Sequence, residues 1–333
     1  MKLLVTGDLH VSDRRVLGRP RLPVTLEMLQ FIFDLAQSYC VDALVFNGDV
    51  IDQKLGFPLD VYLGILGVFE KNKSVRTHWI RGNHESPDAE RPQRTLMRLF
   101  DGLVGTVIDR TYCLSDEGSR VWLAPWWPSE KFKQSIGEIV EQTRHRTFVN
   151  DYLITHVGLA EGTTGPSNFH PPSEVRLKDL YPSKFSRILL GDYHTHQWLV
   201  PDKVCYLGAP IEHTFGDAPS PGVWLLDTTK NTLESVPLVG FPRFRQWQID
   251  STGKLETLRK RLSERPESFD QNDYHRAYTI PAMYDTVAGL LPFADVRALV
   301  KDAQVVVPDD ASRISVLPGV TPEMVIHRWL DYK

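Results

Sequence analysis

The sequence predicts an α/β protein in which two packed, mixed β-sheets are sandwiched by helices, with a small C-terminal α/β domain after them. Three observations support this prediction. Short apolar segments alternate with segments of helical periodicity through the first 143 residues, an order typical of a mostly parallel sheet covered by helices. A second series of short apolar segments follows between residues 152 and 227. The composition then changes near residues 236–244, which indicates a domain boundary.

The composition sets limits on the class of protein. The chain has 333 residues, 42% hydrophobic and 24% charged, with a net charge of −4. This charge excludes a globally basic surface, so any attraction to nucleic acid would come from local patches, bound metals or a partner. The three cysteines are isolated from one another, which predicts reduced thiols rather than a disulfide framework. With neither a secretory signal nor an apolar run of about 20 residues, we expect a cytoplasmic protein without a membrane partner.

Apolar spacing identifies the elements of the first half. Residues Val24–Cys40 carry Leu26, Leu29 and Ile32 at helical spacing, and Val61–Phe69 has the same periodicity. The segment from Pro125 to Pro128 interrupts the pattern before a further helix. The expected helices are Val24–Cys40, Val61–Phe69 and Glu130–Thr143, and the expected strands are Lys2–Thr6, Ala43–Phe46, His78–Arg81, Val107–Ile108 and Arg120–Ala124.

The second sheet is expected from four further apolar runs. They are Tyr152–Ile154, Arg187–Leu190, Val204–Leu207 and Val223–Asp227. Between the first two, the Gly-, Pro- and Ser-rich segment Thr163–Pro172 predicts a loop that could line a site.

The sequence divides into residues 1–240, a small α/β domain at 241–315 and a terminal helix within 316–333. The small domain is expected to contain a helix at Leu255–Arg265, strands at Ala277–Pro281 and Gln304–Val307, and helical periodicity over Val287–Gln304. The tail Val320–Lys333 starts with a helix-initiation signal. This helix could pack on the chain's own core or dock on a partner protein.

Five polar motifs each follow an expected strand. They are GDLH at 7–10, NGDVID at 47–52, GNHE at 82–85, THVG at 155–158 and GDYHTH at 191–196. Asp, Asn and His side chains at several strand ends can converge on one edge of a sheet. Such oxygen and imidazole ligands suit a pair of divalent cations.

The first three motifs offer distinct chemistry. Asp8 and His10 are two residues apart, so in an extended chain they would face one ion. The carboxylate of Asp49 could bridge two metals. Asp52 is the alternative at this site, although it is rather expected to cap the next turn. Asn83 supplies a neutral oxygen ligand. His84 would point toward substrate instead and act as a proton donor, since imidazole titrates near neutral pH.

The last two motifs contain further candidate ligands. His156 follows a strand, and alone it would be interpreted as a core histidine. Because the other four motifs are also present, we consider His156 a candidate metal ligand. In the final motif either Asp192 and His194 or His194 and His196 could face the metals.

The ordered set DxH, GD, GNH[DE], H and GHxH resembles that of the calcineurin-like metallophosphoesterases. Within them, the segment Tyr206–Asp217 resembles the SbcD-type nuclease subunit, which works with an SbcC-type ABC ATPase in DNA break processing. The resemblance covers about residues 1–245, and the length is similar to compact versions found in bacteriophages.

The resemblance implies a ligand set. Asp8, His10, Asp49 and His194 would surround one ion. Asp49, Asn83, His156 and Asp192 would surround the other, with His84 as the catalytic histidine. Members of the family usually carry His where this chain has Asp192. The added negative charge favours hard cations, Mn²⁺ or Mg²⁺.

The resemblance also implies an activity and partners. The chain would be a two-metal DNA exonuclease and endonuclease, binding DNA, an SbcC-like ABC ATPase and a second copy of itself. Arg14, Arg15 and Arg19, which follow the first motif, are candidates for DNA-phosphate contacts. Two other functions stay open: a phosphatase or cyclic-nucleotide phosphodiesterase of the same fold, and a non-catalytic scaffold for the ATPase.

Overall fold

A computed structural model describes residues 1–299 except 53–55, 57, 89–90, 92–93, 101, 104, 144–147, 166–167, 218, 220–221 and 265–268. The chain divides into two compact units. The first comprises Met1–Arg245 and Asp270–His275, and the second comprises Gln246–Phe269 and the chain from Arg276 onward. The strand expected at Gln304–Val307 and the helix expected within 316–333 lie outside the described residues.

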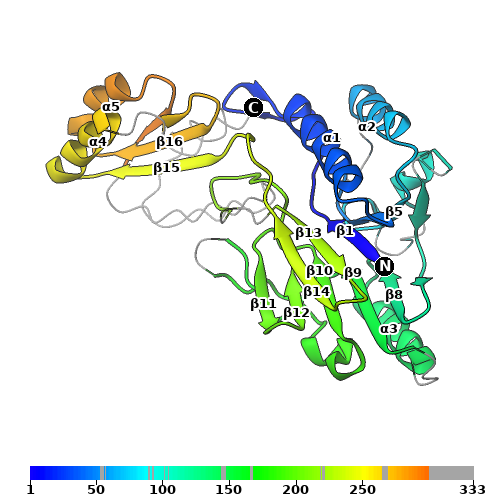
Figure 1. Cartoon of the computed structure of the whole chain (residues 1–333). Helices are drawn as coiled ribbons and strands as arrows, with labels where there is room; N and C mark the ends of the chain where they lie inside the picture. The colour runs from blue at the N-terminus through cyan, green and yellow to red at the C-terminus, as the bar shows by residue number, and fades with distance from the viewer. Residues whose placement is uncertain are drawn as a thin grey trace. The chain divides into compact units, whose positions relative to one another are not determined.

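The first sheet of the first unit has the strand order β14-β13-β1-β4-β5-β6. Strands β1, β4, β5 and β6 are parallel, and β13 and β14 complete the sheet in antiparallel fashion. Figure 1 shows helices α1 and α2 side by side along this sheet. The bounds are β1 Lys2–Thr6, β4 Ala43–Asn47, β5 Thr77–Ile80, β6 Thr106–Ile108, β13 Val223–Asp227, β14 Thr232–Val236, α1 Leu22–Ser38 and α2 Leu59–Lys71.

The second sheet has the order β11-β12-β10-β9-β8-β7. Its central strands β12, β10, β9 and β8 are parallel, and helix α3 packs beside β8 (Figure 1). The bounds are β7 Tyr112–Ser115, β8 Ser119–Ala124, α3 Ser129–Thr143, β9 Asn150–His156, β10 Arg187–Gly191, β11 Gln197–Val200 and β12 Val204–Tyr206.

Short elements complete the first unit. A two-stranded ribbon pairs β2 (Arg15–Val16) with β3 (Arg19–Pro20). Three 3₁₀ turns follow at η1 Leu96–Phe100, η2 Leu177–Leu180 and η3 Pro182–Lys184. No strand was predicted in the segment that forms this ribbon.

Burial explains why the sheets pack. Side chains from both sheets form one shared core, which includes Val5, Val45, Leu123, Ile154 and Leu189, none of them exposed. The opposite faces are covered by α1 and α2 on one sheet and by α3 on the other. The predicted architecture of two packed, mixed sheets with helices is therefore confirmed.

The second unit is a small α/β structure. Its three-stranded sheet has the order β15-β16-β17, and its apolar core includes Ile249, Leu258, Ala277 and Val287. The bounds are β15 Phe244–Ile249, α4 Thr252–Glu264, β16 Tyr274–Thr279, η5 Pro281–Met283, α5 Tyr284–Leu290 and β17 Asp295–Ala298.

One prediction for the second unit is wrong. The helical periodicity assigned to Val287–Gln304 covers only the end of α5, which stops at Leu290. Pro292 follows directly and cannot continue a helix. The chain then forms β17, which pairs in parallel with β16. Among the described residues, no helix has both the length and the apolar character required to cross a membrane.

Candidate metal centre

The loops that follow β1, β4, β5, β9 and β10 meet at one edge of the two sheets. The first two are joined by backbone hydrogen bonds, since Asp8 N donates to Gly48 O and His10 N donates to Asp49 O, each at 3.0 Å. Asp8, His10 and Asp49 have φ angles of 54°, 48° and 51°. Non-glycine residues rarely adopt this left-handed conformation, and its occurrence at consecutive functional loops is typical of active sites.

The conformation of Asp8 and His10 corrects the spacing argument made from sequence. That argument assumed an extended backbone, in which residues i and i+2 point the same way. The backbone at both residues is left-handed instead. Their side chains still converge, because the loop is held against Gly48–Asp49 by the hydrogen bonds above.

One group of donors consists of Asp8, His10 and His194, whose ligand atoms lie within 4.8 Å of one another. The Nε2 atoms of His10 and His194 are only 3.0 Å apart. Their Nδ1 atoms face carboxylates, Asp52 Oδ1 at 3.2 Å and Asp217 Oδ2 at 3.9 Å. A proton on each Nδ1 leaves two Nε2 lone pairs facing each other, an arrangement that a shared cation would stabilise.

A second group consists of Asp8, Asp49 and His156. His156 Nδ1 lies 2.8 Å from the carbonyl oxygen of Asn47, to which it can donate. His156 Nε2 then directs its lone pair at oxygens: Asn83 Oδ1 at 3.1 Å, Asp49 Oδ2 at 3.4 Å and Asp192 Oδ1 at 3.7 Å. Acceptors that face acceptors are unfavourable without a cation, so this donor set also fits a metal ion.

His84 forms a third group of donors with His10 and Asp49, but its other contacts make a different role available to it. Its backbone N donates to Asp49 Oδ1 at 2.9 Å, and its Nδ1 lies 2.5 Å from the carbonyl oxygen of Asp52. Nε2 is left 3.8 Å from Asp49 Oδ2. The His84 side chain is 26% exposed, whereas those of Asp49 and His156 are at most 3% exposed. The His84 side chain is therefore more accessible to a substrate than those of Asp49 and His156.

The electrostatics of these buried groups favour cations. Burial, together with Asp49 and Asp192, raises the pKa of Asp8 to about 6, against the opposing effect of His156 and His194. Burial also raises the pKa of Asp192. Burial alone would lower the pKa of His194, but Asp217, Asp8 and Asp49 raise it to about 9. The centre thus holds protons that divalent cations would displace.

The structure brings together all seven residues predicted as metal ligands: Asp8, His10, Asp49, Asn83, His156, Asp192 and His194. Neither Asp192 nor the alternative ligand His196 belongs to a donor group found among the described residues, but Asp192 Oδ1 lies 3.7 Å from His156 Nε2. His196 Nδ1 hydrogen-bonds the carbonyl oxygen of Tyr206 at 2.7 Å, and the His196 ring lies 4.7 Å from that of Trp224. The geometry therefore favours the Asp192 and His194 pair.

The three arginines proposed for phosphate contacts lie in different surroundings. Arg19 donates to the carbonyl oxygens of Gln271, Asn272 and Asp273 and stacks on Tyr274. Arg15 is exposed and donates to Gly18 O within its own ribbon. Arg14 is the one next to the centre, with Nη1 4.0 Å from Asp52 Oδ2 and Nη2 3.1 Å from His213 O.

Sequence reasoning missed several residues that support the ligands. Asp52 was assigned to turn capping, but its side chain contacts His10 and its carbonyl contacts His84. The buried Glu85 accepts hydrogen bonds from the backbone N of Gly82, Asp49 and Ile51 at 2.8–3.0 Å. Glu85 was visible as the last letter of GNHE, an acid directly after two candidate site residues. His213 and Asp217, by contrast, follow no strand-end motif.

Comparisons with known proteins agree with this arrangement. Two packed, mixed sheets with a dinuclear set of oxygen and nitrogen donors at one edge define a metal-dependent phosphoester hydrolase. The chain belongs to the calcineurin-like phosphoesterase family, whose sequence model matches residues 1–198. No curated protein sequence matches it significantly.

Solved structures similar to this chain include three enzymes. A dimetal phosphatase from Danio rerio is 12% identical with a TM-score of 0.44, covering 67% of this chain and 91% of its own. The nuclease MPE of Pseudomonas putida is 14% identical with a TM-score of 0.34, covering 70% and 87%. The phosphoesterase Yfce of E. coli is 18% identical with a TM-score of 0.33, covering 72% and 95%.

The family uses a dinuclear divalent metal site, and the donors described above fit such a site. When bound, the two ions would supply Lewis-acid activation of the phosphoester and of water. The chain's own contribution would be to orient the predicted ligands through Asp52, Asn47 and Asp217.

Proposed function

We propose that this phosphoester hydrolase is a DNA nuclease that cleaves phosphodiester bonds with two Mn²⁺ or Mg²⁺ ions, as the nuclease subunit of an SbcC–SbcD-like complex. The observation that supports this most is the place of the segment Tyr206–Asp217, on which the resemblance to SbcD-type nucleases rests. Its residues His213 and Asp217 contact Asp8 and His194. The segment that resembles a nuclease is therefore part of the centre itself.

His84 suits the protonation of a poor leaving group such as the 3′-oxygen of a nucleotide. Its Nδ1 can donate to Asp52 O, which leaves Nε2 to exchange a proton with substrate. Asp49 accepts a hydrogen bond from the backbone of His84 and holds the imidazole beside the ligand cluster. Loss of the His84 imidazole should therefore lower the turnover rate more than it weakens metal binding.

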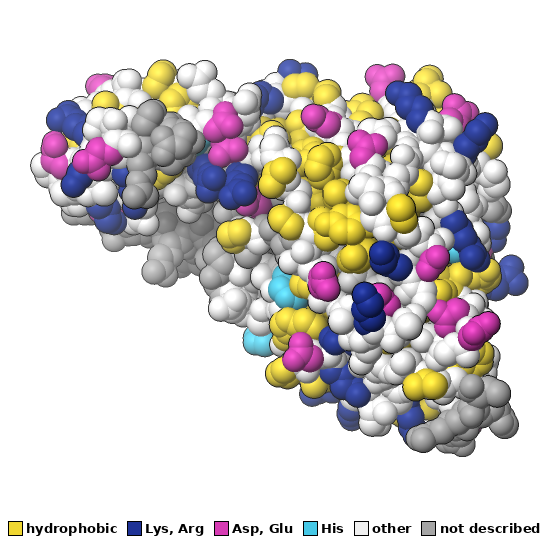
Figure 2. All heavy atoms as spheres, in the orientation of Figure 1, with side chains coloured by type: hydrophobic (Ala, Val, Ile, Leu, Met, Phe, Trp, Pro, Cys, Tyr) yellow, Lys and Arg dark blue, Asp and Glu magenta, His cyan; other side chains and the backbone are white. Residues whose placement is uncertain are grey.

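Arg14 is the arginine best placed to contact a phosphate flanking the scissile bond, because it adjoins Asp52 and His213. On the face of the first unit drawn in Figure 2, basic and acidic side chains are interspersed. Together with the net charge of −4, this makes a few local contacts the source of DNA affinity, which predicts a shallow dependence on salt.

The test compares substrates under one set of conditions. The metal-free protein is supplied with Mn²⁺ and given linear duplex DNA, hairpin DNA, bis-p-nitrophenyl phosphate and p-nitrophenyl phosphate. The proposal expects cleavage of DNA and of the diester, with a drop of about 100-fold or more in His84→Gln. Turnover of the monoester alone would identify a phosphatase and refute the nuclease.

His84→Gln also separates a catalyst from a scaffold. A variant that binds two Mn²⁺ ions like the parent but loses cleavage identifies His84 as the proton donor. If the parent cleaves none of the four substrates, the scaffold function is favoured.

The partner proposals rest on the resemblance alone. We propose an ABC ATPase of the SbcC class, a second copy of the chain and a cytoplasmic location. Size-exclusion chromatography with light scattering tests self-association, and co-purification with an ATPase encoded beside it tests the complex. Removal of residues 316–333 should weaken the complex if the predicted terminal helix docks on the ATPase.

A further inference from the structure

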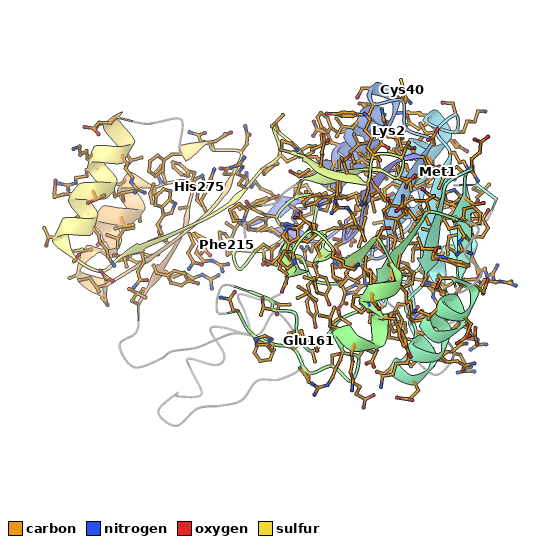
Figure 3. All side chains as sticks on the ribbon, turned by 60° about the horizontal axis from the view of Figure 1, so that its bottom comes forward. Met1, Lys2, Cys40, Glu161, Phe215 and His275 are labelled. Carbon is orange, nitrogen blue, oxygen red and sulfur yellow. The ribbon has the colours of Figure 1, made fainter. Side chains whose placement is uncertain are left out.

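A loop at the edge of the centre lies outside the region that matches the family model. It spans Glu212–Asp217, whereas the matched region ends at residue 198. Figure 3 shows Phe215, within this loop, on the opposite side of the first unit from Met1 and Lys2, where β1 begins. The loop lies beside Asp8, just after the carboxyl end of β1, because its His213 contacts the carbonyl oxygen of Asp8. We call these six residues the 212–217 loop.

His213 connects this loop to Asp8. Its side chain is buried, and its Nε2 lies 2.8 Å from the carbonyl oxygen of Asp8, so Nε2 carries a proton and donates it. The His213 ring is 5.2 Å from the His10 ring and 5.3 Å from the His194 ring. This imidazole is thus adjacent to three predicted ligands while its Nε2 is occupied by a backbone oxygen.

The contact with Asp8 falls on a residue whose backbone needs support. Asp8 has a φ of 54°, and its carboxylate accepts hydrogen bonds from Asp192 N at 3.1 and 3.3 Å. Its backbone N is held by Gly48 O. His213 supplies the hydrogen bond on the carbonyl side. The two hydrogen bonds together hold the peptide groups on either side of Asp8, and this fixes the orientation of its carboxylate.

Asp217 connects the same loop to His194. Its carboxylate accepts hydrogen bonds from His213 N at 2.7 Å and from Thr214 Oγ1 at 2.8 Å. The Oδ2 atom that accepts from His213 N also lies 3.9 Å from His194 Nδ1. The carboxylate that closes the loop therefore also faces the outer nitrogen of a predicted ligand.

The first two residues of the loop are anchored within the first unit. Glu212 Oε2 accepts from Phe244 N at 2.6 Å, and Glu212 O accepts from Arg21 Nη2 at 3.1 Å. His213 O accepts from Arg14 Nη2. Because the loop is held at these points, it can determine the positions of Asp8 and His194 and does not simply adapt to them.

We propose that His213 and Asp217 are positioning residues, which fix Asp8 and His194 and thereby set the affinity for the cation that these two ligands share. Neither residue is a ligand or a catalytic group. The proposal rests on the metal centre and is independent of whether DNA is the substrate. Groups that orient metal ligands typically change metal affinity by about 10–100-fold when removed.

The test measures Mn²⁺ binding to the full chain by calorimetry and by the electron paramagnetic resonance signal of the coupled ion pair. His213→Leu should weaken one of the two ions by about 10–100-fold and alter the coupled signal. His213→Gln should restore binding, because its amide can donate to Asp8 O from nearly the same position as Nε2. His170→Leu, at an exposed histidine, is the matched control and should leave both ions unchanged.

Asp217→Asn tests the second contact and should weaken an ion as well, since the amide is a poorer acceptor for His194 Nδ1. If His213→Leu does not fold, Asp217→Asn and His213→Gln test the positioning role in its place. The proposal is overturned if His213→Leu binds both ions like the parent, if His213→Gln binds as weakly as a folded His213→Leu, or if Asp217→Asn binds both ions normally. A parent that binds two ions yet cuts no DNA rejects the nuclease and leaves this proposal standing.

Discussion

Gly48 occupies a position where any side chain would collide with the metal centre. Its φ is 84°, and a Cβ atom built on it would lie 2.2 Å from His156 Nδ1 and 2.6 Å from His156 Cγ. The imidazole cannot easily move away, because Nδ1 is hydrogen-bonded to Asn47 O and Nε2 faces the carboxylates. Gly48→Ala therefore forces either the loop or His156 to shift.

The cost of Gly48→Ala has two parts. The left-handed backbone costs an alanine roughly 1–2 kcal/mol relative to glycine, and overpacking of a tight site costs typically about 1–3 kcal/mol. Gly240 isolates the first part, because its φ is 87° and no atom lies within 4 Å of its hypothetical Cβ. We expect Gly240→Ala to lose about 1–2 kcal/mol and Gly48→Ala about 2–5 kcal/mol.

Urea unfolding of the metal-free variants, followed by tryptophan fluorescence, measures this difference. Most tryptophans lie in the first unit, so the signal reports on the fold that carries the centre. Calorimetry should in addition show weaker binding of the ion near His156. The collision argument is wrong if Gly48→Ala and Gly240→Ala unfold with free energies within about 0.5 kcal/mol of each other, the usual scatter of surface substitutions.

Three further predictions concern metals and pH. Asp192→His replaces a carboxylate by an imidazole and should raise the Zn²⁺-to-Mn²⁺ ratio bound from an equimolar mixture; an unchanged ratio in metal analysis would contradict this. Removal of metal by a chelator should lower the thermal unfolding midpoint, and Mn²⁺ at about 100 times its dissociation constant should restore about 2.7 kcal/mol; equal midpoints would argue against binding to the folded state. Burial, aided by Arg76, lowers the pKa of His78 from 6.5 to about 4, so the unfolded chain binds the extra proton and stability falls as the pH drops from 6.5 toward 4. His78→Phe should remove about 3 kcal/mol of this acid sensitivity, and an acid-unfolding midpoint equal to that of the parent would disprove it.

The sequence was informative about the centre because each ligand follows a buried strand. Strands β1, β4 and β9 were predicted within two residues of their observed ends, and Asp8, Asp49 and His156 come at or just after those ends. Parallel strands end at a common edge, so strand identity alone predicts convergence. The route of the backbone could not be predicted in this way, as the left-handed Asp8 and His10 demonstrate.

The residues that support the predicted ligands could not be recognised in the sequence, and the reason is physical. His213 lies 205 positions from Asp8, which accepts its hydrogen bond, and Arg19 lies over 250 positions from the carbonyl oxygens to which it donates. Such contacts depend on how distant loops are folded against each other, which has no local periodicity or spacing. The exposure of Arg14, Arg15 and Arg19 was equally undetermined, and only the structure separates Arg14 from the other two.

The group of Asp8, His10 and His194 and the group of Asp8, Asp49 and His156 each draw on both sheets, which couples metal binding to the packing of the first unit. Asp8 and His10 follow β1 of the first sheet, whereas their partner His194 follows β10 of the second.

The other group has the same dual origin. Asp49 and Asn83 follow strands of the first sheet, and His156 and Asp192 belong to the second. Hydrogen bonds already cross the seam, among them those from His156 Nδ1 to Asn47 O and from Asp192 N to Asp8 Oδ1. Since both of these groups take donors from the two sheets, a cation bound by either group would contribute its binding free energy to keeping the sheets together. The shared apolar core between the sheets in turn keeps the seven predicted ligands within reach of one another before any cation arrives.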